Sequence, residues 1–192
     1  MRFPALIFGV LATALALPAS AQTVDVNLSD DVVEAHLKNP LNLGGGPNRA
    51  HYQVGFLYKD DKRNTTMGDL GFEVTGPVAP NAPGFTVGAG INGYLASVAD
   101  YDVGAITLGL MGRYDFAAFE RVSITARINF APDITTFNDG EDFLYTTARL
   151  GYEILSDVEI YMGYRDINVS LDNGRDLGVD QSWMVGLEMK LN

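Results

Sequence analysis

The feature that most constrains this chain is a two-residue alternation of apolar and polar side chains between Phe143 and Val169. The apolar positions are Leu144, Ala148, Leu150, Tyr152 and Ile154 before Leu155-Ser156, and Val158, Ile160, Met162 and Tyr164 after it. Because side chains alternate across a strand, each half has one apolar and one polar face. The pattern predicts a hairpin of two strands, both longer than the usual five or six residues.

The same unit recurs along the chain from His51 onward. The other predicted strands are His51–Lys59, Thr66–Gly76, Phe85–Ala96, Val103–Asp115, Arg121–Ala131 and Gln181–Leu191. No charged residue falls on the apolar face of these strands, and about 9–11 residues suffice for a strand to cross a membrane. We therefore predict an all-β fold, an antiparallel up-and-down transmembrane β-barrel of eight long strands plus a short N-terminal hairpin, eight to ten strands in all.

The N-terminal hairpin is the less certain part of this wall, so two placements stay open. Val24–Leu28 and Val33–Leu37 alternate, and Ser29-Asp30-Asp31 between them suits a turn. A linker rich in Gly and Pro follows over residues 39–48. The hairpin and linker, 22–49, either add two strands to the main barrel of 50–192 or cap its periplasmic mouth.

The polar faces decide which side of the wall meets lipid. They consist mostly of Gly, Thr, Ser and Asn, whereas a soluble barrel with a greasy interior needs a coat dense in Lys and Glu. Small residues suit the crowded interior of a narrow barrel. The charged residues expected in that interior are Glu73, Arg113, Arg127, Arg149, Glu153, Arg165 and Glu188. Their mixed signs predict neutralising pairs, because buried charges persist only when paired.

The strand near 159–169 breaks the alternation after Tyr164, since Ile167 and Val169 have the opposite parity. A β-bulge near Arg165-Asp166 would restore the phase. Short periplasmic turns and longer outer loops are usual in such barrels. We therefore expect 116–120 and 155–156 in the periplasm, and 132–142 and 170–180 outside.

The N-terminus predicts export. A basic start, an apolar run over Ala5–Leu17 and the small residues Ala19-Ser20-Ala21 are typical of a secretory signal peptide, residues 1–21, cleaved near Ala21. No later apolar run approaches eighteen residues, and there is no cysteine. The net charge of −11 argues against nucleic acid as a partner.

Three stretches carry a family resemblance: Val24–Leu37, Ala105–Arg113 and, most strongly, Asn129–Ile167. With Phe130-Ala131-Pro132 and Gly163-Tyr164-Arg165, the chain resembles the YfaZ family of predicted outer-membrane proteins. The resemblance implies a β-barrel in the outer membrane of a Gram-negative bacterium and no particular activity. Its partners would be outer-membrane lipids, lipopolysaccharide and the barrel-assembly machinery. The chain departs from the usual aromatic ending of such barrels, because it finishes Met189-Lys190-Leu191-Asn192.

No motif predicts catalysis, so we expect a non-enzymatic barrel with a structural or narrow-pore, porin-like role and no cofactor. One alternative is a lipid-modifying enzyme using His51, although no Gly-x-Ser-x-Gly elbow is present. Another is a surface-binding module acting through acidic outer loops. Asp139, Glu141 and Asp142 are a weak metal candidate, because carboxylates suit Ca²⁺ and Mg²⁺ but the spacing is not that of an EF-hand.

Overall fold

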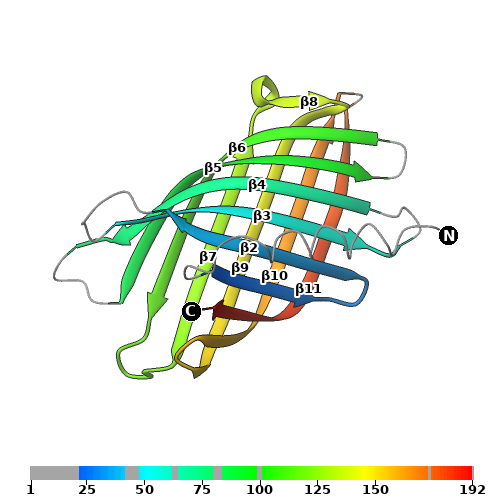
Figure 1. Ribbon diagram of the computed structural model, residues 1–192. Coiled ribbons are helices and arrows are strands. Elements are labelled where there is room, and N and C mark those ends of the chain that lie inside the picture. Colours follow the sequence, from blue (N-terminus) through cyan, green and yellow to red (C-terminus); the bar gives the residue numbers. More distant parts are fainter. Residues whose placement is uncertain are drawn as a thin grey trace.

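The computed structural model describes residues 22–41, 48–61, 65–79, 84–98, 101–172 and 174–191, so the predicted signal peptide lies outside the described residues. Ten strands form a closed antiparallel barrel in which β1 pairs with β11 to complete the ring (Figure 1). In chain order the wall strands are β1 Gln22–Leu28, β2 Val32–Leu41, β3 Arg49–Lys59, β4 Thr65–Pro77, β5 Phe85–Val98, β6 Tyr101–Asp115, β7 Val122–Ala131, β9 Gly140–Leu155, β10 Val158–Leu171 and β11 Arg175–Leu191. A 3-10 turn, Asp133–Thr135, precedes the short strand β8, Thr136–Asn138, which pairs with β6 outside the ring.

The N-terminal hairpin is part of the wall, so of its two open placements the one that adds two strands is correct, and the strand beyond the predicted eight to ten is β8. β1 forms seven residue pairs with β11 and six with β2, and β2 continues the ladder to β3. Without these two strands, β3 and β11 would each leave an unpaired edge, and a barrel avoids such edges by closing. No helix in the described part of the chain is long and apolar enough to cross a membrane.

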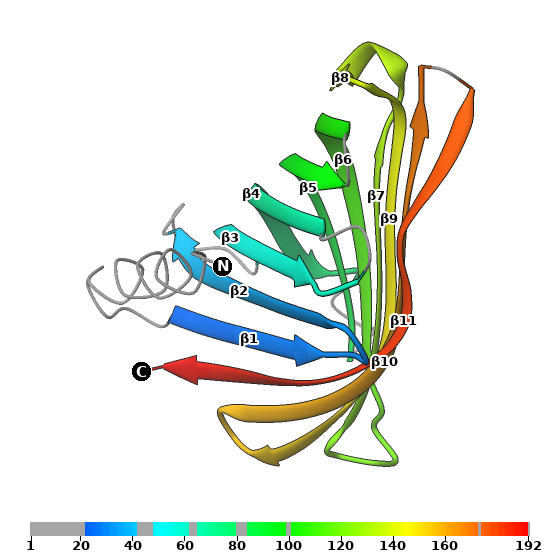
Figure 2. The same ribbon diagram turned by 90° about the vertical axis from the view of Figure 1, so that its right-hand side faces the viewer.

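The barrel has two distinct ends. β1 begins and β11 ends at the same end, which we name the terminal end; the opposite end, where β1 turns into β2 and where β8 lies, is the far end. The strands of the N-terminal half cross those of the C-terminal half steeply on opposite walls (Figures 1 and 2). This strong tilt brings residues far apart in sequence face to face across the lumen.

Outward side chains are apolar over most of the wall. Leu108 is 70% exposed, and Ile124 and Leu150 also point outward. Arg127 and Arg149 lie on the opposite face, in ion pairs inside the barrel. The period of two therefore separates an uncharged outer face from a polar lumen, as the alternation predicted.

On β10 and β11 this arrangement reverses toward the far end. Along β10 the outward residues change from Ile160, Met162 and Tyr164 to Asp166, Asn168 and Ser170. The inward residues change from Tyr161, Gly163 and Arg165 to Ile167, Val169 and Leu171, which are at most 2% exposed. The strand keeps one parity throughout, while the polarity of both faces inverts just beyond Tyr164.

The inversion divides the barrel into two sections. The terminal section runs from the terminal end to the level of Tyr164 and Trp183, whose rings meet edge to face at 5.5 Å. The far-end section lies beyond that level, and its interior is an apolar cluster that we name the far-end core. It consists of Val32, Leu57, Met67, Tyr94, Ala96, Val98, Val103, Ala105, Ala131, Phe143, Tyr145, Ile167, Val169, Leu171 and Val179. Every wall strand except β1 contributes to it.

The bulge predicted near Arg165-Asp166 is therefore wrong. The register shift lies between Ile167 and Asn168, and the additional residue is Val179 on the partner strand β11. Val179 and Asp180 both point into the barrel as a result. The bulge is thus what allows β11 to place one residue in the far-end core and the next among the charged groups below it.

Two predicted outer loops are also shorter than expected. Residues 170–180 are mostly strand, because β10 extends to Leu171 and β11 begins at Arg175. Residues 132–142 contain the 3-10 turn, β8 and the start of β9. Leu171 and Val179 point inward and belong to the far-end core. Because their burial stabilises the strands there, the strands continue where the polar composition had suggested loops.

Candidate functional site

The most distinctive polar feature is a row of four arginines inside the terminal section. Arg113, Arg127, Arg149 and Arg165 come from β6, β7, β9 and β10, which are consecutive strands of the wall. Each points inward because it shares the parity of that strand's polar face. Their main partners across the lumen, Asp25, Glu34 and Glu73, come from β1, β2 and β4. Further carboxylates, Glu159, Asp180 and Glu188, lie on β10 and β11 beside the arginines, so the charges are neutralised both across the lumen and along one wall.

Arg165 lies at the top of this row, directly beneath the far-end core, and is fully buried. Its Nη1 donates to Glu34 Oε2 at 2.7 Å and to Asn27 Oδ1 at 2.8 Å, and its Nε donates to Asp180 Oδ2 at 2.7 Å. The Tyr145 hydroxyl donates to Glu34 Oε1 at 3.0 Å. One guanidinium thus joins β1, β2, β10 and β11 beneath the apolar cluster.

Arg149 is the centre of a second group. Its Nη1 donates to Asp25 Oδ2 at 2.8 Å and its Nη2 to Glu188 Oε2 at 3.2 Å. Lys38 reaches the same Glu188 oxygen at 3.1 Å. The Tyr161 hydroxyl donates to Asp25 Oδ1 at 2.5 Å, while the Tyr161 ring lies 4.7 Å from the Arg149 guanidinium carbon. Two carboxylates and two cations therefore balance one another across the β1–β11 seam.

The remaining arginines have their own carboxylates. Arg127 Nη1 lies 2.7 Å from Glu73 Oε2, and His51 Nε2 lies 3.3 Å from Glu73 Oε1. Arg113 Nη2 lies 2.6 Å from Glu159 Oε2, close to the terminal end. Each lumen arginine of the described chain thus has a carboxylate within hydrogen-bonding distance.

His36 adds a separate contact on the N-terminal wall. Its Nε2 lies 3.2 Å from Asp69 Oδ2 and 3.9 Å from Glu34 Oε1. Gln53 Nε2 donates to the other Asp69 oxygen at 3.3 Å. The inward residue Gly55 lies between His36 and Asp69, where any Cβ would collide with both side chains. A glycine is therefore required on this stretch of β3 for the contact to form.

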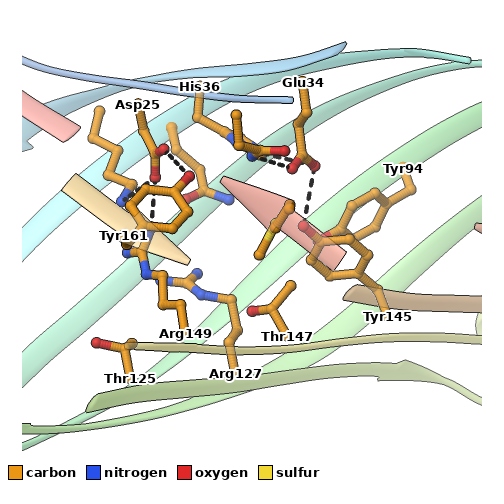
Figure 3. Close-up of a pocket in the computed structure, with 14 residues that line it drawn as sticks. Asp25, Glu34, His36, Tyr94, Thr125, Arg127, Tyr145, Thr147, Arg149 and Tyr161 are labelled. Carbon is orange, nitrogen blue, oxygen red and sulfur yellow. Dashed lines mark hydrogen bonds and ion pairs between the residues drawn. The ribbon is translucent and has the colours of Figure 1, made fainter. Parts of the chain in front are cut away.

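A small cavity lies between these groups, with a volume of about 40 Å³ (Figure 3). Arg127 and Arg149 point toward one another at one side of it, and Asp25, Glu34 and His36 line the opposite side. The Thr125 hydroxyl is buried in its lining and has no hydrogen-bond partner among the described residues. Such a space has room for a few water molecules.

The sequence-predicted interior residues fall in different places. Glu73, Arg113, Arg127, Arg149, Arg165 and Glu188 belong to the lumen ion pairs. Glu153 lies partly exposed near the end of β9, and its carboxylate makes no ion pair within the described residues. Asp139, Glu141 and Asp142 lie at the far end, where Asp139 Oδ2 accepts a hydrogen bond from the Asp102 backbone N–H at 3.0 Å. The described ranges contain no group of three His, Cys, Asp or Glu side chains placed to hold a metal ion.

Several network members were not predicted. They are Asp25, Glu34, His36, Lys38, Asp69, Glu159 and Asp180. The signal for the first four was present, because they alternate with Val24, Val26, Val33, Ala35 and Leu37 in the N-terminal hairpin. Asp180 was missed because residues 170–180 were predicted to form a loop.

A closed barrel with an outer wall that is apolar over most of its surface and a charged lumen defines a small membrane-type β-barrel. The family description "YfaZ precursor" matches residues 5–191, and the chain belongs to this family. A search of curated proteins finds no match.

Solved structures give a looser likeness. The NanC porin is 13% identical, with a TM-score of 0.48 over 89% of this chain and 100% of that one. The KdgM porin in complex with disordered oligogalacturonate is 12% identical, with a TM-score of 0.47 over 90% of this chain and 100% of that one. The outer membrane channel DcaP of Acinetobacter baumannii is 10% identical, with a TM-score of 0.45 over 87% of this chain and 54% of that one. At such values the likeness carries nothing about what this chain does.

Proposed function

We propose that this protein is an integral outer-membrane β-barrel whose lumen is closed, with a structural and non-catalytic role, and that it reaches the outer membrane after cleavage near Ala21. The observation that carries the proposal is the inversion of both faces at the level of Tyr164 and Trp183. Below that level the outer face is uncharged, as a wall in contact with lipid requires. Above it the outward side chains of β10 and β11 become polar and the interior becomes apolar, as in a wall that meets water on that side, whereas Leu95 and Ile106 keep β5 and β6 apolar outside.

The same observation supports a position for the membrane boundary. Tyr and Trp are enriched where a membrane meets water. Trp183 is 70% exposed on the outer wall, and Gln181, two residues toward the far end, is the first polar outward residue on β11. In this proposal the far-end section stands in water outside the cell, and both chain termini face the periplasm.

Closure of the lumen supports a structural role over an open pore. The arginine row is paired with carboxylates, and the far-end core fills the interior at the other end. The lumen position of His51 beside Glu73 gives no support to the lipid-modifying alternative. Lipids, lipopolysaccharide and the barrel-assembly machinery are the proposed partners, because a wall of this kind must be inserted and then solvated by lipid.

Fractionation tests the location. We expect the mature protein in the outer membrane, with a gel mobility that changes on heating because a closed barrel resists detergent until it is boiled. Recovery in the periplasmic soluble fraction would contradict the location. Planar bilayers test closure: the folded wild-type protein should add no steady conductance, and an ohmic current from it would contradict the closed lumen.

A further inference from the structure

The lumen is blocked in two physically different ways along its length. In the terminal section the obstruction consists of charged side chains and a cavity of about 40 Å³. In the far-end section it consists of hydrocarbon, because Phe143, Ile167 and Val169 are completely buried there. The two kinds of obstruction differ in how they respond to water.

The charged obstruction can be wetted. The Thr125 hydroxyl lacks a partner in the described structure, and Arg127 and Arg149 face the cavity from one wall. A water molecule or a small ion can take the place of one charged group in such an ion pair and bind the group that remains. An apolar constriction offers no polar group that water or an ion could bind, so it blocks ions by excluding water.

The boundary between the two obstructions is a single layer. Tyr145 packs its ring in the far-end core and directs its hydroxyl to Glu34, and the β11 bulge places Val179 in the core next to Asp180 in the ion pairs. The apolar barrier is thus a discrete block of the lumen, separable by substitution from the charged part.

We propose that the far-end core is a hydrophobic gate on a latent pore for small inorganic ions. The inference rests on the proposed membrane location and closed lumen. Once the core is wetted, the passage beneath it is lined by arginines from β6, β7, β9 and β10 and by carboxylates from both walls.

The test is conductance of the folded full-length protein in planar bilayers. The variant Val169→Thr/Val179→Thr keeps side-chain shape and adds two hydroxyls to the core, and Phe143→Ala opens space in it. The matched control is Asn168→Ala/Ser170→Ala, which alters the outward face of the same strand. We expect discrete ohmic steps in potassium chloride from both core variants and none from the wild type or the control. Adding Arg127→Ala to a conducting variant should shift the reversal potential in a salt gradient toward cation selectivity.

Each outcome decides something different. Core variants that show heat-modifiable mobility yet stay silent, alongside a silent wild type, overturn the gate and leave the closed barrel standing. A wild type that conducts as well as the variants overturns both. If the core variants do not fold, thiol labelling decides, since the chain has no cysteine of its own. Val169→Cys should resist a water-soluble maleimide and Ser170→Cys should react; equal rates would show that the core is already wet.

Discussion

Along β10 and β11 the two sections of this barrel follow opposite rules although the same strands build both. In the terminal section Met162 faces outward and Arg165 inward, whereas in the far-end section Asn168 faces outward and Ile167 inward. The side chains of β10 keep one alternation of inward and outward positions between them. In the proposed placement the polar and apolar faces follow the medium around each level of the wall, so substitutions at the two levels should have different effects.

The largest effect is expected from the charged layer where the sections meet. Arg165→Ala should destabilise the barrel by about 3–5 kcal/mol, because it leaves Glu34 buried without its closest cation and leaves Asp180 with Lys59 alone. Urea unfolding in lipid vesicles, followed by the fluorescence of Trp183, the single tryptophan, measures it. Arg113→Ala, at a partly exposed pair near the terminal end, should have a smaller effect. Equal losses would mean that depth in the lumen does not matter.

The interior of the far-end section should behave as an ordinary protein core. Ile167→Ala should lower the free energy of unfolding by about 3 kcal/mol, because it leaves a cavity in a close-packed cluster. The comparison variant is Met162→Ala, on the outward face of the same strand. Lipid tails can fill the space that it leaves, so its effect should be within about 1 kcal/mol. A loss of stability from Met162→Ala that exceeds the loss from Ile167→Ala would contradict an apolar core on the inner side of the wall.

A charged substitution on the outer face tests the position of the proposed membrane boundary. Met162→Arg should destabilise the barrel by about 1–2 kcal/mol, because it places a charge on the lipid face two residues below the proposed boundary, where the penalty lies between its midplane and interfacial values. Ser170→Arg, eight residues along the same outward row, should change stability by less than about 0.5 kcal/mol because it meets water. Both values come from the same urea titration. Similar changes in stability at the two sites would contradict a membrane boundary at the level of Tyr164.

The smallest effect concerns one hydrogen bond. Tyr161→Phe removes the donor to Asp25 and should lower stability by about 1 kcal/mol, since Arg149 and Lys38 still neutralise that carboxylate. Tyr152→Phe on the outer wall provides the matched comparison and should be close to neutral. A neutral Tyr161→Phe would show that the hydroxyl adds nothing to the ion pairs.

Local patterns in the sequence were sufficient to predict the barrel class and most strand positions, because alternation depends only on neighbouring residues. The change of phase after Tyr164 was misread as a bulge. A one-residue slip and a change of surroundings look identical in a pattern of period two. The short, charged N-terminal hairpin was ranked below the long strands, since its pairing with β11 is invisible along the chain.

The lumen contacts were beyond sequence reasoning for a geometric reason. Asp25 and Arg149 are 124 positions apart, and Glu34 and Arg165 are 131 apart. Which residues meet across a lumen depends on strand number and stagger. An expectation of eight strands could place arginines inside the barrel without identifying the carboxylates opposite them.

The short seam between β1 and β11 imposes an order on how the chain matures. Residues 22 and 191 become neighbours only when the whole sheet has curled, so the ring closes last and over the greatest possible separation along the chain. Before the ring closes, Asp25 and Arg149 cannot form their ion pair, and both charged side chains are exposed to water. Opening the finished barrel at this seam would separate Asp25 from Arg149 again, so the ion pairs oppose its reopening.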